Sequence, residues 1–243
     1  GGDVGRINTQ NFTLAIHGKI RGYTGARNTI PGTSTTNAHN STAFITTGAS
    51  GKLQFTGTTR DVMVAGEWAS PTNNHSWNLE FAMNSATDTA KINTNFRAGS
   101  ITIASGVVQQ VGGAPRIDGG ALGTGTFTIN SGATYITSFT GLIRNSGERF
   151  GTFNLNSGGN YVIPSSFSAS PNLAASTVNL SGTVTSNNGF LPSNSGITGA
   201  AAVNTLTNLV INAATTTTSD FTVNGILTLN AKLTSSSSAK PTI

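Results

Sequence analysis

The chain has 243 residues, of which 13 are Lys or Arg and 8 are Asp or Glu, and half of the chain is Thr (39), Gly (30), Ser (26) or Asn (26). Charged residues make up only 9%, which excludes a mainly helical protein because amphipathic surface helices need charged side chains. The absence of Cys excludes disulfides and cysteine metal sites. Thr, Val, Ile and Phe favour strands while Gly and Asn favour turns, so the composition predicts an all-β protein.

Charge and hydropathy also argue against two classes of partner. The basic residues behind the net charge of +5 are scattered thinly along the chain, so we expect no nucleic-acid partner. No apolar run approaches the roughly 20 residues of a transmembrane helix, so we expect no membrane span. No motif indicates a cofactor. The chain starts without Met and ends after a Ser-rich stretch, which we interpret as part of a longer product.

The first part of the chain, residues 1–98, is irregular. It contains both Trp, all three His and a long insertion over residues 23–43. We expect this part to cap or decorate the repeats that follow, because a repeat fold must cover its open strand edges. A separate N-terminal domain is the alternative. Even here, apolar residues two positions apart form three pairs: Leu14/Ile16, Leu53/Phe55 and Leu79/Phe81.

Residues 99–243 repeat more regularly. The segments 99–106, 125–132 and 151–158 nearly copy one another at intervals of 26 residues. Residues two apart point to the same side of a strand, so we expect the apolar pair of each copy to occupy an equivalent position facing one shared interior. Six further pairs bring the total to nine: Ile101/Ile103, Phe127/Ile129, Phe153/Leu155, Val178/Leu180, Leu209/Ile211 and Leu227/Leu229.

Strand, corner, strand and loop, repeated without a helical segment, predict a parallel β-solenoid of about nine coils. A second strand resumes at Tyr135 and at Tyr161, at the same offset in two copies. An antiparallel β-sandwich is the alternative, but the Asn-Gly and Asp-Gly hairpin signals do not recur in register. Gly permits the backbone angles of a sharp corner, and it follows the apolar pair in six copies: Gly18, Gly57, Gly106, Gly132, Gly158 and Gly182.

Some β-solenoids cleave sugars, a reaction that needs a pair of carboxylates. Asp61 and Asp88 fall at similar offsets in neighbouring copies, and coils stacked in register would bring them together. The other acidic residues share no offset, so we interpret this pair as solvated corner residues. We therefore expect no enzymatic activity, and a polysaccharide-acting enzyme is the alternative.

Histidine and tryptophan residues are the remaining candidates for a localised site. His17, His39 and His75 occupy unrelated offsets, so we expect no metal site. Trp68 and Trp77 lie close in sequence, where they either pack within a cap or form a carbohydrate contact.

Small polar residues recur on the outward side of the predicted strands, beside Thr102, Thr128 and Thr228. A flat face rich in Thr is the pattern of an ice-binding solenoid, which is a further alternative. We expect like residues to form ladders across the coils in one outward column: Asn130, Asn156, Ser181, Asn212 and Asn230.

Residues 127–134, 153–160 and 206–229 carry a resemblance to a known family, with Phe-Thr-Ile-Asn-Ser-Gly and Phe-Asn-Leu-Asn-Ser-Gly as the clearest stretches. They resemble the repeats of very large secreted β-helical surface adhesins of Bacteroidota, which the type IX secretion system exports. The resemblance implies a non-enzymatic, extracellular rod at the cell surface, structural or adhesive, within a larger protein or filament. Its implied partners are cell-surface glycans or other surface proteins. We also expect self-association through exposed strand edges.

A shorter resemblance concerns modification. Asp88-Thr89-Ala90 resembles the short O-glycosylation acceptor of that phylum. It implies a glycan on Thr89.

Overall fold

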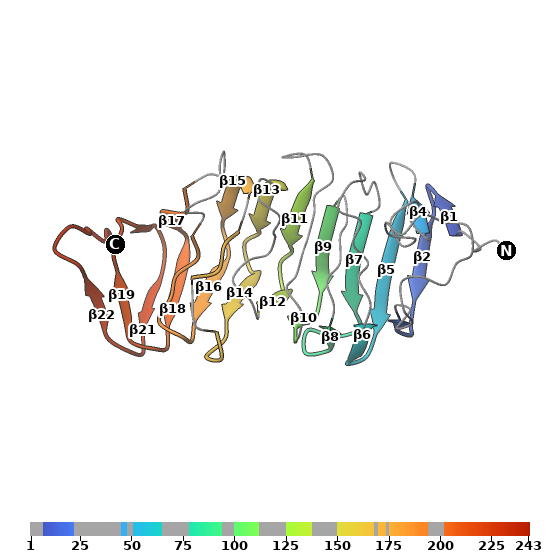
Figure 1. Cartoon of the computed structure of the whole chain (residues 1–243), viewed down its shortest axis with the longest axis horizontal. Coiled ribbons are helices and arrows are strands. Elements are labelled where there is room, and N and C mark those ends of the chain that lie inside the picture. The colour runs from blue at the N-terminus through green and yellow to red at the C-terminus, as the bar shows by residue number, and fades with distance from the viewer. Residues whose placement is uncertain are drawn as a thin grey trace, which may run out of the picture.

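The structure is a computed structural model, which contains 22 strands and no helix in the part of the chain that it describes. The strands stack side by side along the long axis of the molecule, with β1 and β22 at opposite ends (Figure 1). The described residues are 7–21, 45–47, 51–64, 78–93, 100–111, 125–137, 150–167, 170–173, 175–193 and 202–243.

Two long sheets form the sides of this rod. Strands that follow one another in sequence mostly alternate between the two sheets, so neighbours within a sheet come from successive windings. The seven-stranded sheet contains β2 (Thr13–Ile16), β5 (Lys52–Gly57), β7 (Asn78–Met83), β9 (Ser100–Ser105), β11 (Thr126–Ile129), β13 (Phe150–Leu155) and β15 (Ala175–Leu180). The nine-stranded sheet contains β3 (Ile20–Arg21), β6 (Arg60–Val64), β8 (Thr89–Ile92), β10 (Val107–Gln110), β12 (Thr134–Ile136), β14 (Asn160–Ile163), β16 (Thr183–Ser186), β18 (Asn208–Ile211) and β21 (Leu227–Leu229).

All strand pairs in the described residues are parallel, including three pairs of shorter strands. A parallel arrangement contradicts the antiparallel sandwich and confirms the predicted all-β parallel β-solenoid. Nine strands in the longer sheet correspond to nine windings. The short pairs are β1 (Ile7–Gln10) with β4 (Ile45–Thr47), β17 (Thr205–Leu206) with β20 (Thr222–Val223), and β19 (Thr215–Thr217) with β22 (Leu233–Ser235).

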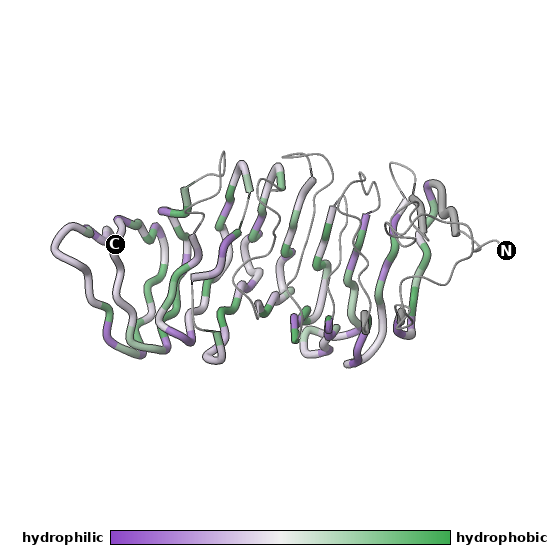
Figure 2. Tube along the Cα trace, in the orientation of Figure 1, coloured by the Kyte–Doolittle hydropathy of each residue, from purple (hydrophilic) through white to green (hydrophobic). Residues whose placement is uncertain are grey.

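Seven of the nine predicted apolar pairs lie in the seven-stranded sheet, in register from one winding to the next. Apolar and polar residues alternate along these strands (Figure 2), and the apolar ones are buried from β5 to β13. Phe55 stacks on Phe81 and Phe127 on Phe153, with ring centroids 5.5 Å and 5.3 Å apart. The predicted shared interior is therefore confirmed for these windings, and stacking of like rings continues the core along the rod.

The last two pairs do not occupy the equivalent position, and that expectation was wrong. Leu209 pairs in register with Val184 and with Leu227, so both pairs belong to the nine-stranded sheet. The physical reason is a shorter winding: residues 202–243 form three short strands per turn, with 18 residues from Leu209 to Leu227. Leu229, in the final winding, is 50% exposed rather than interior.

Four of the six predicted corner glycines have the expected backbone. Gly57, Gly106, Gly132 and Gly158 have φ of 109°, 77°, 75° and 80°, a region that L side chains rarely adopt. Gly18 and Gly182 do not share it. The turn at Gly132 and Gly158 directs the chain into β12 and β14, where the second strand was predicted.

Strands of the irregular first part lie in the same two sheets as the later repeats: β2, β5 and β7 in one, and β3, β6 and β8 in the other. A domain boundary near residue 98 stays a prediction. Between β7 and β9 the chain nevertheless continues the same ladder, Leu79 facing Ile101 in register.

Candidate binding face of the seven-stranded sheet

The outward side of β9, β11, β13 and β15 presents small polar side chains in two columns. Because side chains alternate along a strand, every second residue faces away from the core. The first column is Ser100, Thr126, Thr152 and Thr177, and the second is Thr102, Thr128, Asn154 and Asn179. Parallel register fixes the spacing at about 4.8 Å between windings and roughly 6.7 Å between columns.

The side-chain hydroxyls of five threonines in this array make no hydrogen bond within the described part of the chain. We call them the hydroxyl face: Thr102, Thr126, Thr128, Thr152 and Thr177. None of the four strands carries a charged residue. Each hydroxyl can both donate and accept a hydrogen bond, so this surface offers an uncharged, regularly spaced set of polar groups to whatever lies against it.

Asparagine ladders flank the hydroxyl face. Asn156 donates to Asn130 at 3.1 Å, and Asn179 donates to Asn154 at 2.8 Å.

A separate ladder lies beside the nine-stranded sheet. Asn212 donates to Asn187 and Asn230 donates to Asn212, both at 2.7 Å. The predicted ladders of like residues are present, but the single predicted column was wrong, because the windings near the C-terminus place Asn212 and Asn230 on the other sheet.

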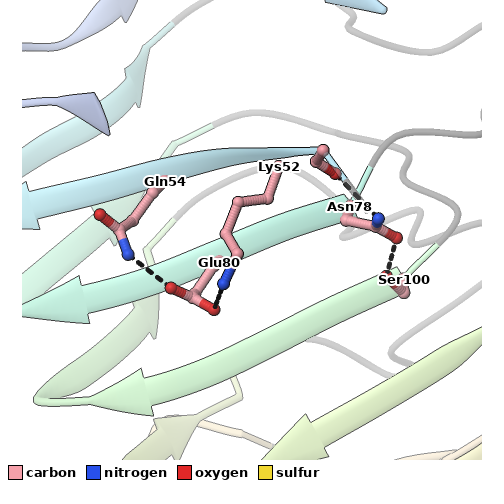
Figure 3. A network of polar contacts seen from close by, with 6 residues as sticks. Lys52, Gln54, Asn78, Glu80 and Ser100 are labelled. Atoms are coloured by element: carbon pink, nitrogen blue, oxygen red, sulfur yellow. Dashed lines mark hydrogen bonds and ion pairs between the residues drawn. The ribbon is translucent and has the colours of Figure 1, made fainter. Parts of the chain in front are cut away.

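The first windings of the same face are different, because their polar groups bond to each other (Figure 3). Lys52 Nζ donates to Glu80 at 2.6 Å, and Gln54 donates to the other oxygen of that carboxylate at 2.5 Å. Asn78 donates to the Gly51 carbonyl at 2.9 Å and accepts from Ser100 at 2.5 Å. The Glu80 side chain is only 16% exposed, so this network holds its charge in place rather than offering it to a partner.

Asp61 and Asp88 lie on neighbouring windings but out of register. Asp61 pairs with Lys91, three residues beyond Asp88. A glycosidase needs two carboxylates that act on one bond, whereas each of these carboxylates has partners of its own. Asp61 accepts a hydrogen bond from Asn93 at 3.3 Å and lies 4.0 Å from the Lys19 ammonium group.

Hydrogen bonds also occupy the carboxylate of Asp88. It accepts from the Ser85 hydroxyl at 2.8 Å and from the Thr59 backbone N–H at 3.1 Å. The Ser85 hydroxyl is the main group that lowers the pKa of Asp88. Desolvation, the next largest effect, opposes it, and hydrogen bonds from Thr59 lower the pKa further. A carboxyl that holds its proton so weakly is a poor general acid near neutral pH.

Thr89, the residue implied for glycosylation, begins β8 and is half-buried. Its hydroxyl donates to the Thr87 carbonyl at 3.4 Å, and its N–H donates to Thr59 Oγ1 at 3.0 Å. Ala90 is fully buried. Glycosylation of Thr89 stays a prediction.

The remaining sequence candidates are the Trp and His residues. Trp68, Trp77, His39 and His75 lie outside the described residues. His17 is described, and its Nδ1 is 2.8 Å from the Thr56 hydroxyl. Within the described ranges, no group of three or more His, Cys, Asp or Glu side chains could hold a metal ion.

Residues of the first column were missed at the level of sequence, although a signal exists. Thr126, Thr152 and Thr177 each directly precede the apolar pair of their copy. The predicted outward residues lie between and after the apolar residues, whereas this column lies directly before them. The recurrence of Thr at that preceding position is the signal for it.

No helix in the described segments is long and apolar enough to cross a membrane. Comparisons with protein-family models, with curated proteins and with solved structures give no match for this chain.

Proposed function

We propose that the chain is a non-enzymatic structural or adhesive rod at the cell surface, a segment of a larger extracellular protein or filament, which contacts glycans or other surface proteins through the hydroxyl face. The observation that carries this proposal is the set of five threonine hydroxyls, aligned over four windings and without partners in the described chain. The resemblance of its repeats to secreted adhesins supports the location.

Repetition gives such a face its physical advantage. A single neutral hydrogen bond contributes only about 0.5–1.5 kcal/mol net, because water competes for the same groups. Several equivalent contacts on one rigid sheet act together, and avidity then exceeds the strength of each contact. A partner with a repeating structure, such as a polysaccharide, would engage successive windings in the same way.

A glycan-binding assay tests the proposal. We expect the immobilised chain to bind members of a glycan panel, and we expect the double substitution Thr128→Glu with Thr152→Glu to weaken binding at least about tenfold. The matched control is Thr183→Glu with Thr185→Glu, which makes the same change at outward positions of β16. Equal binding by both variants, or no binding to any glycan or surface protein tested, would contradict the proposal.

The enzymatic alternative makes a different prediction. A polysaccharide-acting enzyme would release reducing ends from some glycan of the panel, and Asp61→Asn or Asp88→Asn would abolish the release. The proposal expects no release by the unmodified chain. Release that depends on either carboxylate would establish the enzyme instead.

Ice binding is a second candidate, favoured by the same unpartnered hydroxyls. The ligand of the hydroxyls would be the water of the ice lattice. Binding would therefore not require the water already bound to the hydroxyls to be removed. Thermal hysteresis at high protein concentration tests this candidate, with Thr128→Glu and Thr152→Glu expected to abolish the effect. A null result for the unmodified chain removes ice binding and leaves the adhesive rod.

Self-association is part of the proposal and is supported by the last winding. β21 is the edge strand of the nine-stranded sheet, and Ile226 and Leu229 are 68% and 50% exposed beside it. Edge strands with apolar neighbours pair readily with another chain. Sedimentation equilibrium should show concentration-dependent association that Leu229→Lys reduces and Val111→Lys, at an exposed position after β10 in the middle of the same sheet, does not. A monomer at all concentrations would contradict it.

A further inference from the structure

Two tyrosines lie stacked inside the solenoid. Tyr135 on β12 and Tyr161 on β14 pair in register, and their rings are 6.0 Å apart at an angle of 27°. Phe127 and Phe153 contact them edge-on, at 5.3 Å and 6.0 Å. Both tyrosines are 1% exposed, so their phenol groups lie within the apolar core.

Neither phenol oxygen makes a hydrogen bond of normal geometry with the protein. The Thr137 side chain lies near enough to act on both phenols, and it lowers their pKa against the larger effect of burial, so the distance between these groups leaves both oxygens without a well-formed bond. Leaving a buried polar group unpaired is unfavourable, and buried polar groups in proteins almost always have a protein or water partner. Two such oxygens in adjacent windings therefore require an explanation. A stack that needed only apolar packing would be satisfied by phenylalanine, as in the neighbouring Phe127 and Phe153.

Further polar side chains share this part of the core. Thr137 is fully buried and lies two residues after Tyr135, on the same inward side. Its N–H donates to the Val162 carbonyl at 3.1 Å, which places it beside the strand of Tyr161. Gln110, also buried, follows the residue that pairs with Ile136 in the next winding. Polar groups from three successive windings thus lie close together on the inward side of the nine-stranded sheet.

We propose that Tyr135, Tyr161 and Thr137 form an internal hydration site that holds at least one structural water molecule, bridging the two phenol oxygens. A buried water makes two to four hydrogen bonds with polar groups, and two phenols and a threonine hydroxyl supply that number. The site has no charged group among its named residues, and burial raises the pKa of both phenols. Neutral donors and acceptors suit water rather than an ion.

This inference is independent of what the outer face binds. Its consequence is local stiffness: a bridging water would join β12 to β14 inside the core, at the level where the hydroxyl face lies outside. The hydration site would therefore add a link between two windings inside the core. The backbone hydrogen bonds that align Thr126 with Thr152 link the same two windings on the other sheet.

The sign of a stability change tests the proposal. Tyr161→Phe and Tyr135→Phe preserve ring packing and remove one hydroxyl each. If water bridges the hydroxyls, each single variant loses a bonded partner and the melting temperature falls by about 2–4 °C. If the hydroxyls are unpaired, their removal raises the melting temperature. The double variant should fall by less than the sum of the single changes, because the first substitution already breaks the bridge.

A crystal structure at high resolution provides the direct observation. We expect electron density for a water molecule within hydrogen-bond distance of both phenol oxygens, and we expect it to be lost in the double variant. Thr137→Val, which replaces a third partner without removing a bridge between the tyrosines, should keep that density. Absence of the water in the unmodified chain, or a rise in melting temperature for either single variant, overturns the proposal.

Discussion

The outward side of the seven-stranded sheet contains two regions that differ in where their polar groups bond. Around β5 and β7, Lys52, Gln54 and Glu80 bond to one another, and Asn78 bonds to Ser100. From β9 to β15 the five threonines of the hydroxyl face have no such partners. The strands pair in parallel register in both regions, with one shift between Phe81 and Ala82 where β7 meets β9, so the difference lies mainly in the side chains. A closed network contributes to stability, whereas an open array is available for binding.

The largest expected effect tests what the two regions share. Phe153→Ala beneath the hydroxyl face and Phe81→Ala beneath the network each remove a fully buried stacked ring. We expect each to lower the free energy of unfolding by about 3–5 kcal/mol, through lost burial and the cavity left behind. Denaturant unfolding measures this cost. Only Phe153→Ala should also weaken glycan binding, because it displaces the strand that carries Thr152. A cost below about 1 kcal/mol in either variant would show that the core tolerates rearrangement.

A smaller effect is expected from opening the closed network. Glu80→Gln neutralises the carboxylate that accepts hydrogen bonds from Lys52 and Gln54, and it replaces one of the two carboxylate oxygens with an amide NH2 group. We expect the free energy of unfolding to fall by about 1 kcal/mol, since the pair is only partly buried and solvent screens part of its attraction. The difference from the unmodified chain should shrink in high salt, which denaturant unfolding at two ionic strengths measures. Glycan binding should be unchanged, and a loss of binding would assign the network to the binding face.

The open region gives the complementary result. Thr128→Val keeps the shape of the side chain and removes a hydroxyl that has no partner in the described chain. We expect the free energy of unfolding to change by no more than about 0.5 kcal/mol, while glycan binding weakens. Thr56→Val is the matched control, because the Thr56 hydroxyl bonds to His17 outside the hydroxyl face. A clear loss of stability with unchanged binding would show that Thr128 has a structural role instead.

Much of this architecture is predictable because a solenoid repeats its constraints in sequence. The apolar pairs at Phe127/Ile129 and Phe153/Leu155 and the corners at Gly132 and Gly158 are set by alternation and backbone geometry, which are local. The transfer of Leu209 and Leu227 to the other sheet is not local. An apolar pair has the same sequence pattern whether its strand belongs to the seven-stranded or to the nine-stranded sheet. Only the shorter interval between those two leucines indicated that the winding had changed.

The candidate site was less predictable, because it depends on corner length. Two residues lie between Gly57 and Arg60, while six lie between Met83 and Ala90, although both ends are in register. The longer corner places Asp88 out of register with Asp61 despite their similar offsets. The ion pair between Lys52 and Glu80 likewise depends on residues from two different windings. The same is true of the Thr128 hydroxyl, which finds no partner on the windings beside it. These contacts follow from stacking, which no single repeat specifies.

The smallest expected effect concerns the corner between Met83 and Ala90, which follows the strand of Glu80. Hydrogen bonds lower the pKa of Asp88, so its contribution to stability is present above the ordinary pKa of about 3.9 and is lost as the pH falls through the folded value. Ser85→Ala should raise the pKa of Asp88 toward the ordinary value, as followed by NMR titration of its carboxyl carbon. Thr87→Ala is the matched control, because the Thr87 hydroxyl lies 3.2 Å from Ser85 but makes no bond to Asp88. An Asp88 pKa that does not respond to Ser85→Ala would show that Thr59, across the winding, is its main partner.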